Sequence, residues 1–305
     1  MKKLLAAACM LGLLLTACGA PAATETEDDD TLHILATTYP VYLFTTAVTE
    51  GVENVEVSLL VNQPVSCLHD YTLTVTDMKA IEGADVIVRN GAGLEDFMDD
   101  ALAASEGAVI DCSAGLELLP AMGHEGHDHD TEYDPHIWMD PACAQDMMAV
   151  IAQGLGEALY GDDWASHGEF HTNQLVAKDV LEQARQRWAE QLAPLAGAEL
   201  ITFHDGFQYF SRAFDLTLLK AIEEEEGAEA SAAEIQEIAG LIAEYDIPAI
   251  FTEVNGSDAT ANAIARETGV AVEQLDMIMS GGGTGIQPYI DAMQGNIDTI
   301  VEALG

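Results

Sequence analysis

Histidines and carboxylates are concentrated in one short stretch of the sequence, GHEGHDHD, at residues 123–130. The stretch contains His124, His127 and His129, and imidazole nitrogens and carboxylate oxygens are donors that bind divalent ions such as zinc. Its glycines and its polarity predict a mobile loop, which would lose much conformational entropy on forming a tight site. We therefore predict that a tighter site lies elsewhere in the chain and that these three histidines have an accessory role beside it, either collecting zinc or sensing its abundance. A solvated loop with adventitious affinity is the alternative.

Four further residues of these types lie just beyond predicted β-strands. They are His69 after VEVSLL, His136 in DPHIWMDP, His204 at the end of ELITFH, and Asp276 directly after VAVEQL. Three imidazoles and one carboxylate suit zinc, whereas calcium or magnesium would require more oxygen ligands. Each histidine taken singly also fits an ordinary hydrogen-bonded loop residue, and their wide spacing matches no local motif.

Short β-branched runs that alternate with helical patterns are expected to position these residues. The runs occupy residues 32–37, 55–60, 85–90 and 108–111 in the first half of the chain, and 199–204, 216–220, 248–253 and 270–275 in the second. Thr74, with Asp77 three residues later, predicts the start of one of the helices. The alternation predicts mostly parallel sheets flanked by helices.

A long helical pattern separates the two sets of strands. It covers residues 171–195 and ends near Pro194. We predict an α/β protein with an N-terminal lobe (residues 32–170, including a His-rich loop at 121–134), a linker helix (171–195) and a C-terminal lobe (196–305). Because ligands bind at the carboxyl ends of parallel strands, the metal site is expected in the cleft between the lobes.

The composition narrows the class of partner. Hydrophobic residues make up 49% of the 305-residue chain, which is enough for folded lobes, and the formal net charge is −43. Such a polyanion is repelled by nucleic acid and by anionic lipid head groups, and it favours cations. An acidic surface also promotes solubility without any binding role.

The N-terminus predicts export. Lys2 and Lys3 precede a short apolar run that ends in Leu15-Thr16-Ala17-Cys18, which has the layout of a signal peptide (residues 1–17) and resembles a bacterial lipobox. The resemblance implies lipid attachment at Cys18, a flexible tether at residues 18–31, and anchoring to the outer face of the bacterial cytoplasmic membrane. Cys67, Cys112 and Cys143 remain in the body and can form at most one disulfide, whose pairing the sequence does not decide.

Four segments resemble the zinc/manganese solute-binding proteins of ABC importers, and specifically the zinc-type (ZnuA-like) lipoproteins among them. The segments begin LHDYTLTV, DPHIWMDP, TFHDGFQYF and QLDMIMSGGG; DPHIWMDP is the most specific, and the likeness covers nearly all of the mature chain. Carried over residue by residue, the resemblance implies His69, His136 and His204 as imidazole ligands and Asp276 as the carboxylate ligand. It also implies that the helix joining the lobes is rigid.

The resemblance further implies a function. Members of this kind capture zinc with high affinity outside the membrane and deliver it to an ABC importer, that is, to its permease and, through the permease, to its ATPase. We accordingly expect a monomer that performs no chemistry on the ion. In this resemblance, a histidine at the third ligand position is typical of the zinc-type members and a carboxylate of the manganese-type. His204 therefore favours Zn²⁺ over Mn²⁺.

One departure and two alternatives stay open. Cys67 and Leu68 stand where many family members have Asp-Pro, which places a thiol near the predicted site. The alternatives are a manganese-type receptor of the same family and a secreted zinc-dependent hydrolase with Glu253 or Asp205 as general base. The sequence contains no compact H-E-x-x-H signature to support the hydrolase. In the receptor, Glu253 is expected to support a ligand or to replace one.

Overall fold

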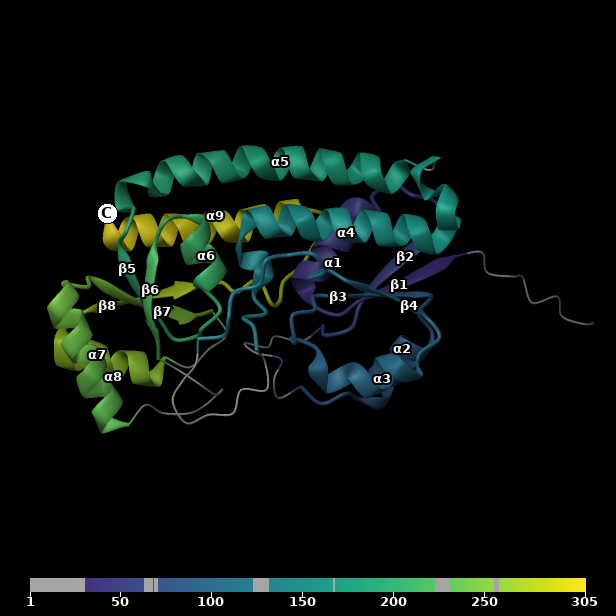
Figure 1. The fold of residues 1–305 in the computed structure, drawn as a ribbon. Coiled ribbons are helices and arrows are strands. Elements are labelled where there is room, and N and C mark those ends of the chain that lie inside the picture. Colours follow the sequence, from purple (N-terminus) through teal and green to yellow (C-terminus); the bar gives the residue numbers. More distant parts are fainter. Residues whose placement is uncertain are drawn as a thin grey trace, which may run out of the picture. The chain divides into compact units, whose positions relative to one another are not determined.

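The computed structural model describes residues 31–62, 68, 71–122, 132–166, 168–222, 231–254 and 258–305 (Figure 1). By their internal contacts, residues 31–305 form one unit. We call residues 31–168 the first half and residues 193–305 the second half. Several residues singled out in the sequence lie outside the described residues: His69, Cys67, the histidines of GHEGHDHD, the predicted signal peptide and the predicted lipidation site at Cys18.

Two four-stranded parallel sheets form the framework. The first contains β1 (Leu32–Ala36), β2 (Val55–Leu59), β3 (Val86–Arg89) and β4 (Ala108–Asp111) in the order β2-β1-β3-β4. The second contains β5 (Glu199–Thr202), β6 (Thr217–Ala221), β7 (Ala249–Glu253) and β8 (Ala271–Leu275) in the order β6-β5-β7-β8. The same strand order is therefore used twice. All eight predicted runs are strands, which confirms the α/β class.

Helices flank both sheets (Figure 1). In the first half, Thr74 and Asp77 form the predicted capping box of α2, with Thr74 Oγ1 accepting from Asp77 N at 3.3 Å. The helices of the first half are α1 (Tyr39–Val48), α2 (Val75–Glu82), α3 (Asp99–Ala104) and α4 (Pro141–Tyr160), with short 3₁₀ turns η1 (Asp96–Met98), η2 (Ile137–Met139) and η3 (Gly161–Ser166). Those of the second half are η4 (Ala193–Leu195), α6 (Gln208–Ala213), α7 (Ala232–Tyr245), α8 (Ala259–Thr268) and α9 (Gln287–Leu304).

The helix expected to connect the halves is α5 (Glu169–Leu192), which continues into η4 at Pro194. It packs along α1 and α4 of the first half and along α9 of the second, as Figure 1 shows. Leu181 and Trp188 on its inner face are fully buried, whereas Val176, which also contributed to the predicted periodicity, is 60% exposed. Within the described part of the chain, no helix is both long enough and apolar enough to cross a membrane.

One hydrophobic core extends through both halves. It includes Val88 of the first sheet, Trp188 of α5, Phe251 of the second sheet and Tyr289 of α9. A smaller cluster lies within the second half, against α7 and α8. Cys112 and Cys143, the two body cysteines that the structure describes, are buried free thiols, so the one disulfide that the sequence allows does not join these two.

A buried carboxyl group, Glu95, lies under the carboxyl ends of β1 and β3. Its residue is 1% exposed, and its oxygens accept hydrogen bonds from Thr37 Oγ1 (2.7 Å), Asn90 N (2.7 Å) and Gly91 N (2.9 Å). Burial raises the pKa of Glu95 to about 7, although these hydrogen bonds and the Arg89 charge act in the opposite direction.

This raised pKa predicts a pH-dependent stability. Because the folded pKa of about 7 exceeds the ordinary value of 4.5, the contribution of Glu95 is fully present below pH 4.5 and is lost as the pH rises to 7. At about 1.4 kcal/mol per pH unit, the loss amounts to about 3 kcal/mol. Urea unfolding of the wild type and of Glu95→Gln between pH 4 and 8 measures this loss. The free energy of unfolding of the wild type minus that of the variant should fall as the pH rises. A difference that stays constant with pH would contradict the prediction.

Candidate metal centre

His136 is the most buried of the described candidate ligands. It follows β4 and immediately precedes η2, and it is 5% exposed. Its backbone N and its Nδ1 lie 2.9 Å and 2.7 Å from Asp134 Oδ1, and Asp134 is itself 3% exposed. Burial disfavours the imidazolium, but the carboxylates of Asp134, Asp205 and Glu253 outweigh it and raise the pKa of His136. Asp134 thus directs Nδ1–H toward itself and leaves Nε2 as the atom that can bind a metal.

His204 has the same arrangement in the second half. It lies just beyond β5, and its Nδ1 is 3.2 Å from Glu253 Oε1. Glu253 is the last residue of β7 and is 7% exposed, so the carboxyl ends of two neighbouring strands supply the imidazole and its carboxylate partner. This position agrees with the expectation that Glu253 supports a ligand.

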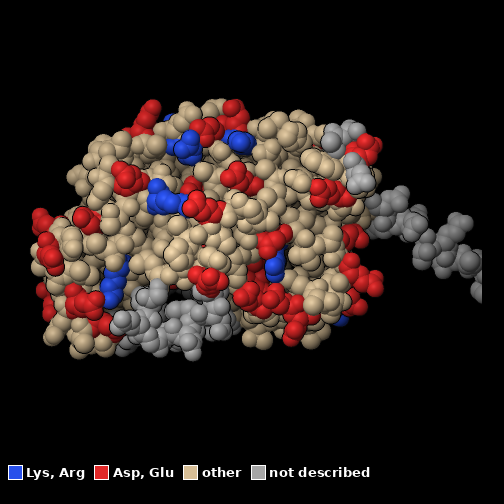
Figure 2. All heavy atoms as spheres, in the orientation of Figure 1, with Lys and Arg blue, Asp and Glu red and all other residues tan. Residues whose placement is uncertain are grey.

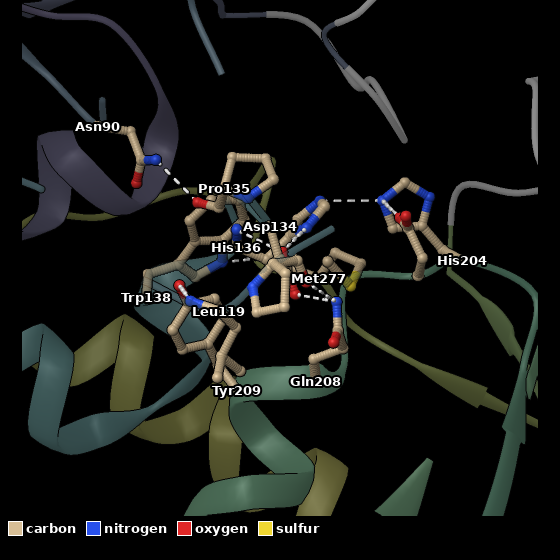
Figure 3. Close-up of polar contacts among 12 residues, drawn as sticks. Asn90, Leu119, Asp134, Pro135, His136, Trp138, His204, Gln208, Tyr209 and Met277 are labelled. Carbon is tan, nitrogen blue, oxygen red and sulfur yellow. Dashed lines mark hydrogen bonds and ion pairs between the residues drawn. The ribbon is translucent and has the colours of Figure 1, made fainter. Parts of the chain in front are cut away.

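The two imidazoles point their remaining nitrogens at each other. His136 Nε2 and His204 Nε2 are 3.0 Å apart, with the rings nearly perpendicular (Figure 3). We assign a Nδ1–H to both rings from their carboxylate partners, which gives both Nε2 atoms a lone pair. A contact of this length between two acceptors requires a proton between them, and a metal ion would replace that proton. The pair can therefore supply two nitrogen ligands to a metal ion.

Asp205 adds an oxygen donor to this pair. Among the described residues, His136, His204 and Asp205 form a group whose potential ligand atoms all lie within 4.8 Å of one another. The Asp205 carboxylate is 3.8 Å from His204 Nε2, and its side chain is 33% exposed. From the sequence, Asp205 is expected only as a general base in the hydrolase alternative. Its place directly after His204 was the signal that could have identified it as a neighbour of the candidate metal site.

Asp276 lies where the strand pattern predicts, directly after β8. It is outside the group of three, so its part in metal binding stays a prediction. Its Oδ1 accepts the N–H of Ile278 at 2.7 Å. Burial raises the pKa of the Asp276 carboxyl, and this hydrogen bond acts in the opposite direction.

Other residues brace the segment that carries His136, and the sequence did not reveal them. Gln208 Nε2 of α6 donates to Asp134 Oδ2 at 3.0 Å, and Asn90 Nδ2 donates to the carbonyl oxygen of Pro135 at 2.8 Å (Figure 3). Amide side chains have no distinctive spacing, so only the folded structure identifies these contacts. They hold His136 from both halves.

Gly206 lies against both histidine rings. A Cβ atom at this position would be 2.9 Å from His204 Cδ2 and 3.0 Å from His136 Cδ2, and closer still to the end of the Met277 side chain. The distance to His204 is shorter than real Cβ contacts, and the distance to His136 is tighter than most of them, so an added Cβ would displace the His204 ring. Glycine therefore allows the two imidazoles to meet.

The chain thus has two parallel sheets with the same strand order, and histidines from both halves converge. The family described as Zinc-uptake complex component A periplasmic, ZnuA, matches residues 34–303, and the chain belongs to this family. This confirms the resemblance inferred from the four sequence segments.

Individual relatives agree with this membership. The chain is 29% identical over 293 residues to "Zinc-binding lipoprotein AdcA" of Streptococcus pneumoniae (92% of this chain, 56% of that protein). It is 31% identical over 247 residues to "Zinc-binding protein TroA" of Treponema pallidum (77% and 78%). A solved structure, "Crystal structure of ZnuA", superposes with a TM-score of 0.75 at 27% identity, covering 90% of this chain and 100% of that one. The chain thus spans little more than half the length of AdcA.

Proposed function

We propose that the protein is an extracytoplasmic receptor that binds zinc with high affinity and delivers it to an ABC importer. The observation that carries the proposal is the pair of Nε2 atoms 3.0 Å apart, contributed by opposite halves and each backed by a buried carboxylate. The proposed ligands are His69, His136, His204 and Asp276. Membership of a family described by zinc uptake supports the same reading.

Zinc is favoured over manganese by the donor atoms. Imidazole nitrogen is a good ligand for zinc, whereas manganese prefers sites richer in carboxylate oxygen. The two relatives described above are both named for zinc. A manganese-type receptor remains the less supported alternative.

A receptor needs a closed site, and an enzyme needs an open one. Four protein ligands fill the tetrahedral positions of zinc, which leaves no position for a reactive water. Glu253, the proposed general base of the hydrolase alternative, lies against His204 Nδ1, where it orients a ligand. These features support binding and release of the ion without catalysis.

The proposed partners are the permease of the importer, its ATPase through the permease, and the membrane through a lipid on Cys18. Relatives named as lipoproteins support the anchor, as does the lipobox-like sequence. Acidic side chains outnumber basic ones on the face shown in Figure 2, which suits attraction of a cation and repels nucleic acid. We further propose a monomer organised as lobes 32–170 and 196–305 around the linker helix 171–195.

Isothermal titration of the mature chain with Zn²⁺ and Mn²⁺ tests the proposal. We expect one tight equivalent of zinc and weaker binding of manganese. Weaker zinc events beyond the first equivalent are assigned to His124, His127 and His129, and should disappear in a variant that lacks residues 123–130. Absence of a tight zinc equivalent in the wild type would refute the proposed function. Loss of the tight equivalent in the variant that lacks residues 123–130 would show that the tight site does not lie where we propose it.

A further inference from the structure

Trp138 joins the segment that carries His136 to the segment that carries Asp276. Its indole is fully buried, and its Nε1–H donates to the carbonyl oxygen of Met277 at 2.9 Å. The His136 ring lies beside the same indole, with ring centroids 5.2 Å apart (Figure 3). One side chain of the first half thus contacts the ring of one proposed ligand and the main chain next to another.

The helix α9 holds the same two segments. Tyr289 donates its hydroxyl hydrogen to the carbonyl oxygen of Trp138 at 2.7 Å. Asn296 accepts the N–H of Asp276 at 2.7 Å and donates to its carbonyl oxygen at 2.8 Å. Tyr289 and Asn296 are 0% and 2% exposed, so breaking any of these bonds would leave a buried polar group unsatisfied. The two segments are therefore fixed to a common support.

The turn that follows Asp276 is strained. Ile278 has a φ of 60°, a left-handed conformation that β-branched residues rarely adopt. Strained backbone of this kind persists only where the surrounding structure holds it, and it is concentrated at functional sites. The carbonyl group that Trp138 binds belongs to Met277, between Asp276 and Ile278, so Trp138 acts on the centre of the turn.

We propose that Trp138 is a positioning residue for metal binding. Its hydrogen bond to Met277 keeps the strained turn in the conformation that directs the Asp276 carboxylate toward the ion held by His136 and His204. The inference rests on the proposed zinc function and on Asp276 being a ligand. Trp138 acts through the main chain of Met277, and it prepares two ligand segments from opposite halves before the ion arrives.

The test compares two tryptophans in matched surroundings. Trp138→Phe removes the N–H and keeps an aromatic ring. Trp188→Phe is the control, because Trp188 is also fully buried and its Nε1–H donates to Gln294 Oε1 at 2.8 Å, between α5 and α9. Partners that orient metal ligands contribute about 10–100-fold to affinity, so we expect the zinc Kd to rise at least about tenfold in Trp138→Phe only. Visible absorption of bound Co²⁺, which reports ligand geometry, should change in the same variant only.

The outcomes separate the two proposals. If wild type binds no zinc tightly, the proposed function fails. If wild type, Trp188→Phe and Trp138→Phe all bind zinc equally and give the same Co²⁺ spectrum, only the role of Trp138 fails. Should Trp138→Phe not fold, Tyr289→Phe removes a single hydroxyl from the same support. A raised zinc Kd in that variant supports the inference, and an unchanged Kd overturns it.

Discussion

Replacing His136 with alanine is expected to weaken zinc binding by at least about 100-fold. Loss of a partner that only orients a ligand already costs about 10–100-fold, and this change removes a ligand itself. It also leaves the Asp134 carboxylate, 3% exposed, without the imidazole that it contacts at 2.7 Å. Asp134 keeps its hydrogen bonds from the backbone N–H of residue 136 and from Gln208, so the variant loses one hydrogen bond to a charged group, which costs about 1.5–3 kcal/mol of stability.

Competition titration against a chromophoric zinc chelator measures the change, at a temperature where circular dichroism shows the variant to be folded. His171→Ala is the control, because His171 lies on the exposed side of α5 and should leave the affinity unchanged. An affinity for zinc within about threefold of wild type would show that the two facing histidines are not the tight site.

Adding one methyl group at Gly206 is expected to have the second-largest effect. The new Cβ would lie 2.9 Å from His204 Cδ2 and 3.0 Å from His136 Cδ2, so the His204 ring must shift away from the new Cβ. Zinc–nitrogen bonds are about 2.0–2.1 Å long, and a shift of several tenths of an ångström breaks the geometry. We expect the zinc affinity of Gly206→Ala to fall by about 10–100-fold, the range seen when ligand orientation is disturbed.

Gly282→Ala provides the matched control for this second variant. Gly282 lies in the glycine-rich segment that follows Asp276, and a Cβ there would have open space around it. Titration with zinc should distinguish the two alanine variants clearly. Equal affinities for them would mean that the rings can move without cost, and the site would then be less rigid than its contacts indicate.

The sequence predicted the framework well because periodicity and strand-end position are local properties. Runs of β-branched residues marked every strand, and the predicted capping box of α2 is present. The rule that ligands lie beyond the carboxyl ends of parallel strands pointed to His204 and Asp276, and both residues do lie just beyond strands. That rule needs only the order of residues along the chain.

The bracing of the site could not be predicted in the same way. The contacts of Asp134 with Gln208 and of Trp138 with Met277 join residues that are far apart in the chain. Buried amide, indole and carbonyl groups pair with whatever the fold brings near, and no composition or spacing records the pairing. Asp205 is an intermediate case: its place directly after His204 is visible in the sequence, but its closeness to His136 of the other half is visible only in the structure.

The shared hydrophobic core bears on how an ion can enter and leave. A hinge that swung the two halves apart would expose the apolar side chains that pack across them, including Phe44 of α1 and Tyr289 of α9, whose ring centroids are 5.2 Å apart and which are both 0% exposed. Each square ångström of apolar surface exposed costs roughly 25 cal/mol, so wide opening would use up much of a fold's stability of about 5–15 kcal/mol. We therefore expect ion binding and release to depend on short movements of individual side chains and turns around the ion, while the two halves keep their relative position.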